Sequence, residues 1–283
     1  MSIIVSSYFA PANVQEAVSL KRKLRDKALV VAGGTSTVQL INKMIIEPPA
    51  IISLERVPLD YVKIRANSVE IGATTSIARL VESRGLPNAL KKAAESVHGL
   101  ALKDMATVGG NIFTPAPAGD IATALLSLDA VLILRGGKGT RSVPLSKFYK
   151  GPLQFNIRSD EILTAVRINK PPKFSAFLKQ TPWKYSGPTI ASVSVSLDLD
   201  KNGKARRVMV ALGCLTTHPY RAKKVEKMIT GEKLTKQLID RAAQQLTDGV
   251  EVIEDALASS WYRRELAQVL FKRILYNFIS RGD

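Results

Sequence analysis

The spacing of hydrophobic residues near the N-terminus predicts a small unit of alternating helices and strands. Asn13 followed by Glu16 makes a start like a capping box, in which each side chain can bond a free backbone amide of the first helical turn. Apolar residues then recur at helical spacing through about Leu24. The elements expected here are a helix over 14–24, a strand over 28–32, a helix over 37–44 and a strand over 50–54.

From about Tyr61 the pattern changes to the alternation that is typical of half-buried strands. Val69, Ile71 and Ala73 would share one face, because successive side chains of a strand point to opposite sides. The remaining elements expected in this part are a helical stretch over 75–98, a loop over 104–120, a helix over 120–130, strands over 131–135 and 141–145 on either side of a Gly-Gly-Lys-Gly turn, and a strand over 162–168.

Pro171 and Pro172 interrupt the backbone hydrogen-bonding pattern, so we place a domain boundary near residues 170–176. Beyond them, strands over 189–199 and 206–215 flank a hairpin turn signal at 200–203. Helices are expected near 219–229, 235–247 and 259–280, the last with Leu266, Leu270, Ile274 and Phe278 in a stripe typical of a core or subunit contact. The fold class is therefore α+β, with domains at 1–172 and 173–283 and subdomains of about 1–56 and 57–172.

Composition supports an ordinary folded protein and excludes several kinds of site. At 283 residues the chain exceeds what one hydrophobic core usually organises. No apolar run approaches the roughly 20 residues that cross a bilayer, and the start lacks the features of a signal peptide, so we expect a cytoplasmic protein without a membrane span. Cys214 is the single cysteine, so this chain alone cannot form an internal disulfide, a cysteine-held iron–sulfur cluster or a structural zinc site. With two histidines, we predict no metal site.

The formal net charge of +17 raises the question of an acidic partner. Nucleic-acid binding would favour one concentrated basic face with aromatic side chains between the charges. Lysines and arginines are instead spread over almost every segment, with modest clusters at 21–27, 201–207 and 221–227. This distribution favours a basic solvated surface, or one matched to acidic partner subunits.

The first chemically informative motif is the segment from Ala32 through Gly33, Gly34 and Thr35 to Ser36, between a predicted strand and a predicted helix. Unpaired backbone amides at such a junction can hold a phosphate, and glycine permits close approach. No lysine completes a Walker-type loop, so a pyrophosphate held by backbone and hydroxyl groups suits the motif better than a phosphate that is transferred. A simple turn remains the alternative interpretation.

The second motif is the segment from Thr107 through Gly109 and Gly110 to Asn111, followed by Asp120 at the head of the next predicted helix. A long loop inside a compact domain is more often a binding loop than a neutral connection. Asp120 could orient a hydroxyl of a cofactor, or it could simply cap the helix.

Together these motifs resemble the FAD-binding medium subunits of molybdenum hydroxylases, the family related to the flavin domain of xanthine dehydrogenase and to carbon monoxide and aldehyde dehydrogenases. The resemblance covers nearly the whole chain. It includes ALVVAGGTS (28–36), ISLERVPLDYVKI (52–64), ATVGGNIFTPAPAGDIATALLSLDAVLIL (106–134), RSVPLSKFYKGPL (141–153), DEILTAVRI (160–168) and GCLTTHPYRAKKVEKMI (213–229). The chain departs from the family pattern at 102–105 and at 181–185.

The resemblance implies a two-subdomain FAD-binding domain of the type found in p-cresol methylhydroxylase (PCMH) and vanillyl alcohol oxidase, followed by a C-terminal domain with a small antiparallel sheet and helices. Ala32 to Ser36 would hold the pyrophosphate, and Thr107 to Asn111 would line the other side of the cofactor. Asp120 would take a hydroxyl or adenosine-side position, while Leu153 and Lys179 match family positions near the flavin. A cation at Lys179 would stabilise an anionic reduced flavin.

The function implied is electron transfer, with no catalytic residue in this chain beyond the flavin. A large subunit would carry the molybdenum cofactor, a small subunit would carry 2Fe–2S clusters, and the whole would form a dimer of heterotrimers. Two alternatives are a stand-alone FAD-dependent oxidoreductase, and a basic nucleic-acid-binding or scaffold protein whose glycine pairs are only turns. Uptake of FAD by the chain would separate the two flavoprotein interpretations from the nucleic-acid-binding or scaffold interpretation.

Overall fold

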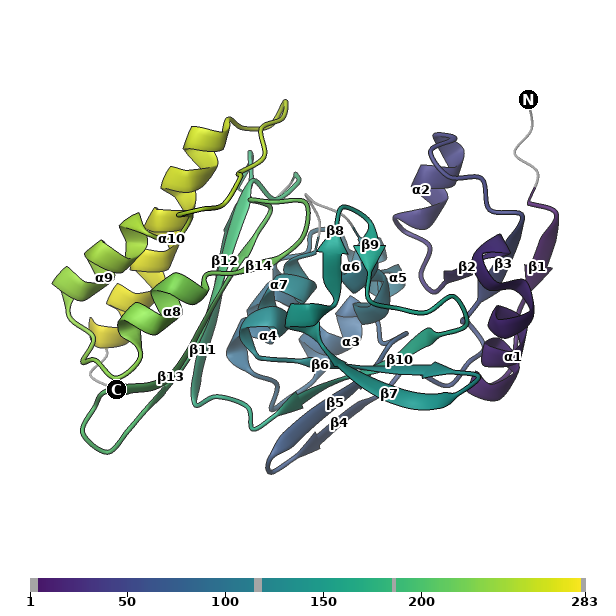
Figure 1. Ribbon diagram of the computed structural model, residues 1–283, viewed down its shortest axis with the longest axis horizontal. Coiled ribbons are helices and arrows are strands. Elements are labelled where there is room, and N and C mark those ends of the chain that lie inside the picture. Colours follow the sequence, from purple (N-terminus) through teal and green to yellow (C-terminus); the bar gives the residue numbers. More distant parts are fainter. Residues whose placement is uncertain (1–4, 115–118, 185–186, 281–283) are drawn as a thin grey trace.

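The N-terminal part of the chain folds around a short parallel sheet. The computed structural model describes residues 5–114, 119–184 and 187–280, and the N-terminal part lies at one end of the molecule (Figure 1). Its sheet has the order β1-β3-β2, with all pairs parallel. The elements are β1 (Ser7–Phe9), α1 (Val14–Leu24), a 3₁₀ turn (Arg25–Lys27), β2 (Ala28–Val31), α2 (Thr37–Asn42) and β3 (Ala50–Ser53).

Helix α1 begins as its sequence predicts. The side chain of Asn13 accepts a hydrogen bond from the Glu16 amide at 2.9 Å, and the Glu16 carboxylate accepts from the Ala12 amide at 2.8 Å. These two bonds satisfy amides at the start of the helix that have no partner within it. The helix packs Ala17 and Val18 into the core. The one strand that the pattern did not predict here is β1.

The second subdomain is a five-stranded antiparallel sheet covered by helices on one face. The strand order is β4-β5-β10-β6-β7, and Val69, Ile71 and Ala73 are buried together as predicted. The strands are β4 (Val62–Arg65), β5 (Ser68–Gly72), β6 (Val131–Gly136), β7 (Gly139–Pro144) and β10 (Ile162–Asn169). The helices are α3 (Ile77–Glu82), α4 (Asn88–Glu95), α5 (Leu100–Met105), α6 (Val108–Phe113) and α7 (Asp120–Ser127). A 3₁₀ turn (Leu145–Lys147) leads to a hairpin of β8 (Tyr149–Gly151) and β9 (Gln154–Phe155).

Two predictions for this subdomain were wrong. The stretch 75–98, expected as one helical part, is divided into α3 and α4, and Pro87 stands immediately before α4. The expected loop over 104–120 contains helix α6, which the side chain of Thr107 caps. Residues 115–118 of that stretch lie outside the described residues.

The C-terminal domain is an antiparallel sheet of order β11-β12-β13-β14 with helices on its outer face (Figure 1). The strands are β11 (Phe174–Gln180), β12 (Ala191–Leu199), β13 (Ala205–Gly213) and β14 (Tyr220–Arg221), and the helices are α8 (Lys223–Ile229), α9 (Lys236–Gln244) and α10 (Ser260–Ser280). The predicted stripe on α10 is core, because Leu270, Ile274 and Phe278 are buried against the sheet. Strand β11 was not predicted.

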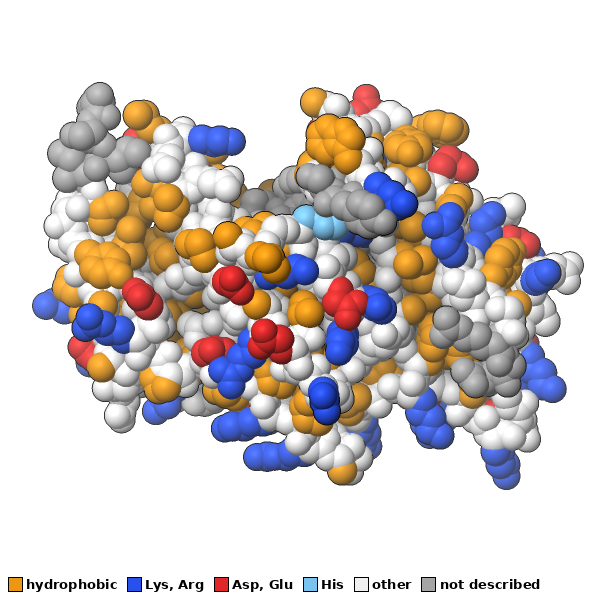
Figure 2. Space-filling model, turned by 180° about the vertical axis from the view of Figure 1, so that it is seen from behind, with side chains coloured by type: hydrophobic (Ala, Val, Ile, Leu, Met, Phe, Trp, Pro, Cys, Tyr) orange, Lys and Arg blue, Asp and Glu red, His pale blue; other side chains and the backbone are white. Residues whose placement is uncertain are grey.

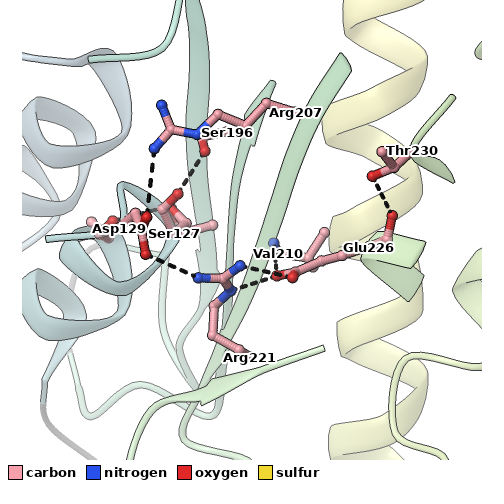
Figure 3. Close-up of polar contacts among 10 residues, drawn as sticks. Ser127, Asp129, Ser196, Arg207, Val210, Arg221, Glu226 and Thr230 are labelled. Carbon is pink, nitrogen blue, oxygen red and sulfur yellow. Dashed lines mark hydrogen bonds and ion pairs between the residues drawn. The ribbon is translucent and has the colours of Figure 1, made fainter. Parts of the chain in front are cut away.

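The inner face of this sheet packs against α7 through small hydroxyl side chains. The Ser127 and Ser194 oxygens lie 2.6 Å apart across the junction. At the end of α7, Asp129 lies 3.8 Å from the Arg207 guanidinium and 3.7 Å from that of Arg221 (Figure 3). The domains are therefore joined by a polar seam as well as by apolar packing. None of the helices in the described ranges combines the length and apolar character that a bilayer crossing needs.

Candidate functional site

A cavity of about 910 Å³ lies where the two subdomains and the C-terminal domain meet. Its volume is near the upper end of the roughly 300–1,000 Å³ that is usual for ligand sites. Its lining residues come from elements that include α1, the start of β10, α7 and β11. All the predicted cofactor-binding residues lie along its wall: Ala32, Gly33, Gly34, Thr35, Ser36, Thr107, Gly109, Gly110, Asn111, Asp120, Leu153 and Lys179. The fold therefore gathers into one place residues that the sequence places far apart.

The first glycine pair is required by the local backbone. A Cβ atom on Gly33 would lie 1.6 Å from the carbonyl oxygen of Met105, so only glycine allows the loop to meet the end of α5. Gly34 has φ of +70°, a left-handed conformation that side chains disfavour. The pair therefore brings the chain from β2 along the cavity wall and turns it into α2.

This loop lines the cavity and contains a row of backbone amides without an acceptor among the described residues. The amides of residues 33–37 have no acceptor among the described residues, and the first amide that is bonded in this turn belongs to Val38, which donates to the Gly34 carbonyl at 2.9 Å. The Ser36 hydroxyl lies 3.4 Å from that of Thr114 on the opposite wall. Consecutive free amides with hydroxyls beside them form a concave site for an anion such as a pyrophosphate.

The second glycine pair has a different local role. The Thr107 hydroxyl caps α6 by accepting from the Gly110 amide at 3.0 Å, and the Gly109 amide donates to the Ala73 carbonyl at 2.8 Å. A Cβ on Gly109 would lie 2.7 Å from that carbonyl oxygen. The side chain of Asn111 accepts from the Ala122 amide at 3.0 Å and so ties α6 to α7. These amides are already used, so this segment shapes the opposite wall through close packing.

Asp120, Lys179 and Thr189 form a buried polar cluster at one end of the cavity. The Lys179 ammonium lies 2.7 Å from the Asp120 carboxylate, and the two side chains are 10% and 9% exposed. The Thr189 hydroxyl donates to both carboxylate oxygens at 3.2 Å. The cap of α7 is Gly119, so Asp120 does not serve as the helix cap.

The contact between Asp120 and Lys179 limits the positions that the two residues can take beside one ligand. An adenosine-side position for Asp120 and a flavin-side position for Lys179 cannot both hold, because the two side chains touch at one end of the cavity. Both side chains line the same part of the cavity. Of the two positions expected for Asp120, the one beside a ligand hydroxyl is compatible with this contact.

Leu153 is held in an unusual backbone conformation at the cavity mouth. It has φ of +53° at the turn between β8 and β9, lines the cavity and is 59% exposed. A residue other than glycine in this region is strained by roughly 1–3 kcal/mol and persists where the surroundings fix it. Phe148 and Phe155 stack in this hairpin at 5.4 Å, and the Tyr149 hydroxyl donates to the Ile112 carbonyl at 2.9 Å. Burial raises the pKa of Tyr149, so its hydroxyl remains a donor.

Several cavity residues were missed by the sequence reasoning. They are Lys21, Asp26, His98, Arg158, Glu161 and Thr189. Burial lowers the pKa of His98, and the nearby charges of Lys179 and Lys103 lower it further. Glu161 lies at the other end of the cavity, where Arg141 contacts it through two bonds of 2.6 and 2.8 Å. Burial raises the pKa of Glu161, but the bonds from Arg141 and from the Arg158 amide outweigh it, so the pKa is lowered overall. No local pattern singles these residues out, because each is a common polar residue brought to the wall by the fold.

Two further observations bear on what the site can hold. The described residues contain no cluster of three or more histidine, cysteine or carboxylate side chains that could bind a metal ion. On the face shown in Figure 2, lysine and arginine side chains are spread among acidic and apolar ones. The cavity, with an anion site in its first loop and an ion pair at one end, therefore fits an organic phosphate ligand.

Comparisons with known proteins agree with this geometry. A family model described as the FAD binding domain in molybdopterin dehydrogenase matches residues 4–171. A second model, described as the CO dehydrogenase flavoprotein C-terminal domain, matches residues 176–278.

The chain is similar over nearly its whole length to subunits of several dehydrogenases. It is 28% identical to the nicotinate dehydrogenase FAD-subunit of Eubacterium barkeri, over 97% of this chain and 96% of that one. It is also 28% identical to the glyceraldehyde dehydrogenase medium chain of Sulfolobus acidocaldarius, over 93% and 95%. A solved structure of carbon monoxide dehydrogenase from Hydrogenophaga pseudoflava superposes with a TM-score of 0.90 at 25% identity, covering 98% of both chains.

Proposed function

Because the chain belongs to the family of FAD-binding subunits of molybdopterin dehydrogenases, we propose that it passes electrons from a partner subunit to an external acceptor through its FAD. The electrons would come from 2Fe–2S clusters on a small subunit, which receives them from a molybdenum cofactor on a large subunit. When bound, FAD supplies the redox chemistry, since it can take up electrons singly and release a pair. The chain itself binds, orients and shields the cofactor.

The observation that carries this proposal is the row of free amides at residues 33–37, in a loop that lines a cavity between two subdomains. Amides at the start of a helix have no partner within that helix, and a bound anion would satisfy them. The residues present therefore fit FAD. The hydroxyls of Thr35 and Ser36 would add donors to the same phosphate oxygens.

The other predicted residues have distinct roles in this proposal. Thr107 to Asn111 form the wall opposite the pyrophosphate. Leu153, held above the cavity mouth, supplies an apolar surface against the ring system. The Asp120–Lys179 pair also lines the cavity, where Asp120 can accept a hydrogen bond from a cofactor hydroxyl. Because the ion pair is close to neutral as a unit, Lys179 stabilises an anionic reduced flavin only as far as Asp120 leaves its charge unbalanced.

The domain limits that we propose agree with the parts of the chain from which these residues come. Residues 1–172 would form the FAD-binding domain, with subdomains of about 1–56 and 57–172 on either side of the cavity. Residues 173–283 would form the C-terminal domain, which supplies Lys179 and Thr189 to one end of it. Both domains are therefore needed for a complete site.

We propose a dimer of heterotrimers as the assembly. Carbon monoxide dehydrogenase from Hydrogenophaga pseudoflava has a chain that is called the medium chain, which supports a complex of several subunits here. The net charge of +17 would favour an acidic partner, because complementary charge raises the rate of encounter.

Rapid mixing of the complex tests the electron path. The chain is purified with its iron–sulfur and molybdenum subunits, the clusters are reduced under anaerobic conditions, and the flavin absorbance is followed. We expect flavin reduction to keep pace with cluster reoxidation, and to slow as salt rises when the subunits are mixed separately. A flavin that remains oxidised while the clusters discharge directly to the acceptor would contradict the proposal. Turnover of an organic substrate by the isolated chain would instead support a stand-alone flavoprotein.

A further inference from the structure

The C-terminal domain contains a completely buried arginine outside the cavity. Arg263, in the first turn of α10, is 0% exposed. Its guanidinium donates to the carbonyl oxygens of Ile190 and of Cys214, the latter at 2.9 Å, and to the Asp255 carboxylate at 2.6 Å. These acceptors lie just before β12, just after β13 and in the segment leading to α10. One side chain therefore connects three separate segments of the domain by hydrogen bonds.

Burial of the Arg263 charge costs free energy, so the hydrogen bonds that its guanidinium makes are needed to offset that cost. Moving a guanidinium out of water costs several kcal/mol even after the protein relaxes, and an apolar side chain of similar volume often packs equally well. The Nε atom of Arg263 has no hydrogen-bond partner among the described residues, which adds to the cost. The planar guanidinium can bridge acceptors at fixed angles, which neither lysine nor an apolar residue can do.

The carbonyl that Arg263 holds adjoins the cavity wall. Ile190 directly follows Thr189, and Thr189 donates to both carboxylate oxygens of Asp120. Holding the Ile190 carbonyl orients the peptide group between Ile190 and Ala191 and so limits the backbone rotation of Ile190, the residue next to Thr189. The Thr189 hydroxyl in turn limits rotation of the Asp120 carboxylate, whose other partner is Lys179. The contacts form a continuous path from the first turn of α10 to a side chain that lines the cavity.

We propose that Arg263 is a positioning residue of the cofactor site, acting through Ile190 and Thr189 on Asp120. The inference rests on the proposed FAD function and adds to it a residue and a route. It makes α10 part of the site, although α10 contributes no side chain to the cavity wall as described. The orientation of Asp120 towards the cofactor then depends on the hydrogen bonds that Arg263 makes within the C-terminal domain.

The neighbouring residue supplies a matched control. Arg264 lies on the same helical turn and also donates to two backbone carbonyls, those of Thr247 at 3.2 Å and Val250 at 3.0 Å. These carbonyls belong to a segment that does not line the cavity. Substitution of either arginine by glutamine removes two backbone contacts of α10. Arg263→Gln also removes the bond to the Asp255 carboxylate, and it alone affects the route to Asp120.

FAD titration of the full-length chain tests the proposal, with the dissociation constant and the visible circular dichroism of bound flavin as readouts. We expect Arg263→Gln to raise the dissociation constant about tenfold and to change the flavin dichroism, and Arg264→Gln to change the constant by less than about twofold. Equal weakening by both variants would mean that α10 only stabilises the domain in general, and would overturn the proposal. An unchanged constant in Arg263→Gln would overturn it as well.

Substitution of Thr189 tests the second step of the same route without changing Arg263. Thr189→Val removes the hydroxyl at nearly constant volume, and Thr189→Ser restores it. We expect Thr189→Val to weaken FAD binding about tenfold and Thr189→Ser to recover most of the affinity. In the Thr189→Val background, Arg263→Gln should add less than about twofold, and two independent tenfold effects would contradict a shared route. If the parent chain binds no FAD at all, it is the proposed function that fails.

Discussion

Breaking the buried ion pair between Asp120 and Lys179 should destabilise the protein more than removing both charges. The ammonium and carboxylate are 2.7 Å apart with side chains 10% and 9% exposed. At an effective dielectric constant of about 20, Coulomb's law gives an attraction of roughly 6 kcal/mol, which offsets a desolvation cost of several kcal/mol per ion. Removing one partner forfeits the attraction and leaves the other charge buried, so each single variant should lose about 3–5 kcal/mol.

Thermal unfolding of the FAD-free chain measures this effect. We expect Asp120→Asn and Lys179→Met each to lower the unfolding midpoint by roughly 5 °C or more, and the double variant to lose less than either single variant. Lys224 and Asp248 form the matched control, since their distance is also 2.7 Å but their side chains are 57% and 46% exposed. Breaking that pair should change stability by about 0–1 kcal/mol. Equal losses at the two pairs, or strictly additive losses at the buried pair, would refute the reasoning.

The remaining predictions concern the other parts of the cavity wall. The lowered pKa of Glu161 stabilises the folded state above the ordinary carboxyl pKa of 4.5, and this stability is lost as pH falls through the folded-state pKa. Arg141→Gln should therefore be less stable than the parent near neutral pH, and should lose less stability than the parent on acidification. Thermal midpoints measured over a pH series check this, and an unchanged pH dependence would count against it. Leu153→Gly should relieve the positive φ and leave the midpoint equal or higher, while weakening FAD binding severalfold; loss of stability would show that the strain argument is mistaken. Gly33→Ala should cost about 1–3 kcal/mol of unfolding free energy, because its Cβ would meet the Met105 carbonyl; an unaltered midpoint would contradict the close approach.

Much of the fold could be predicted where a segment carries a strong period. Helix α1, strand β2 and the stripe on α10 agree with their patterns, because burial of one face follows directly from spacing. Helix α6 could not be predicted, since its sequence VGGNIF contains two glycines and has low helix propensity. The Thr107 cap and packing on Ala73 stabilise it, and these contacts depend on the tertiary structure.

The candidate site likewise combines residues that the sequence predicts with residues that only the fold brings together. The loop at 33–36 could be predicted, because glycines between a strand and a helix are a local signal. The cluster of Asp120, Lys179 and Thr189 could not be derived from spacing, since its members are 59 and 69 residues apart and come from different elements. The resemblance to a family supplied Asp120 and Lys179 but not their contact. Thr189 and Arg263 carry no pattern that separates them from ordinary core residues.

The central claim is that this chain holds FAD by the free amides of residues 33–37. Equilibrium titration of the desalted parent chain with FAD, beside Thr35→Asp and Thr35→Asn, tests it most directly, because the two substitutions have nearly the same shape and differ in charge. The account predicts one FAD per parent chain, at least tenfold weaker binding by Thr35→Asp because its carboxylate repels the pyrophosphate, and a much smaller loss in Thr35→Asn. Equal FAD affinity in Thr35→Asp and the parent would contradict the account, since no anion could then lie on this loop.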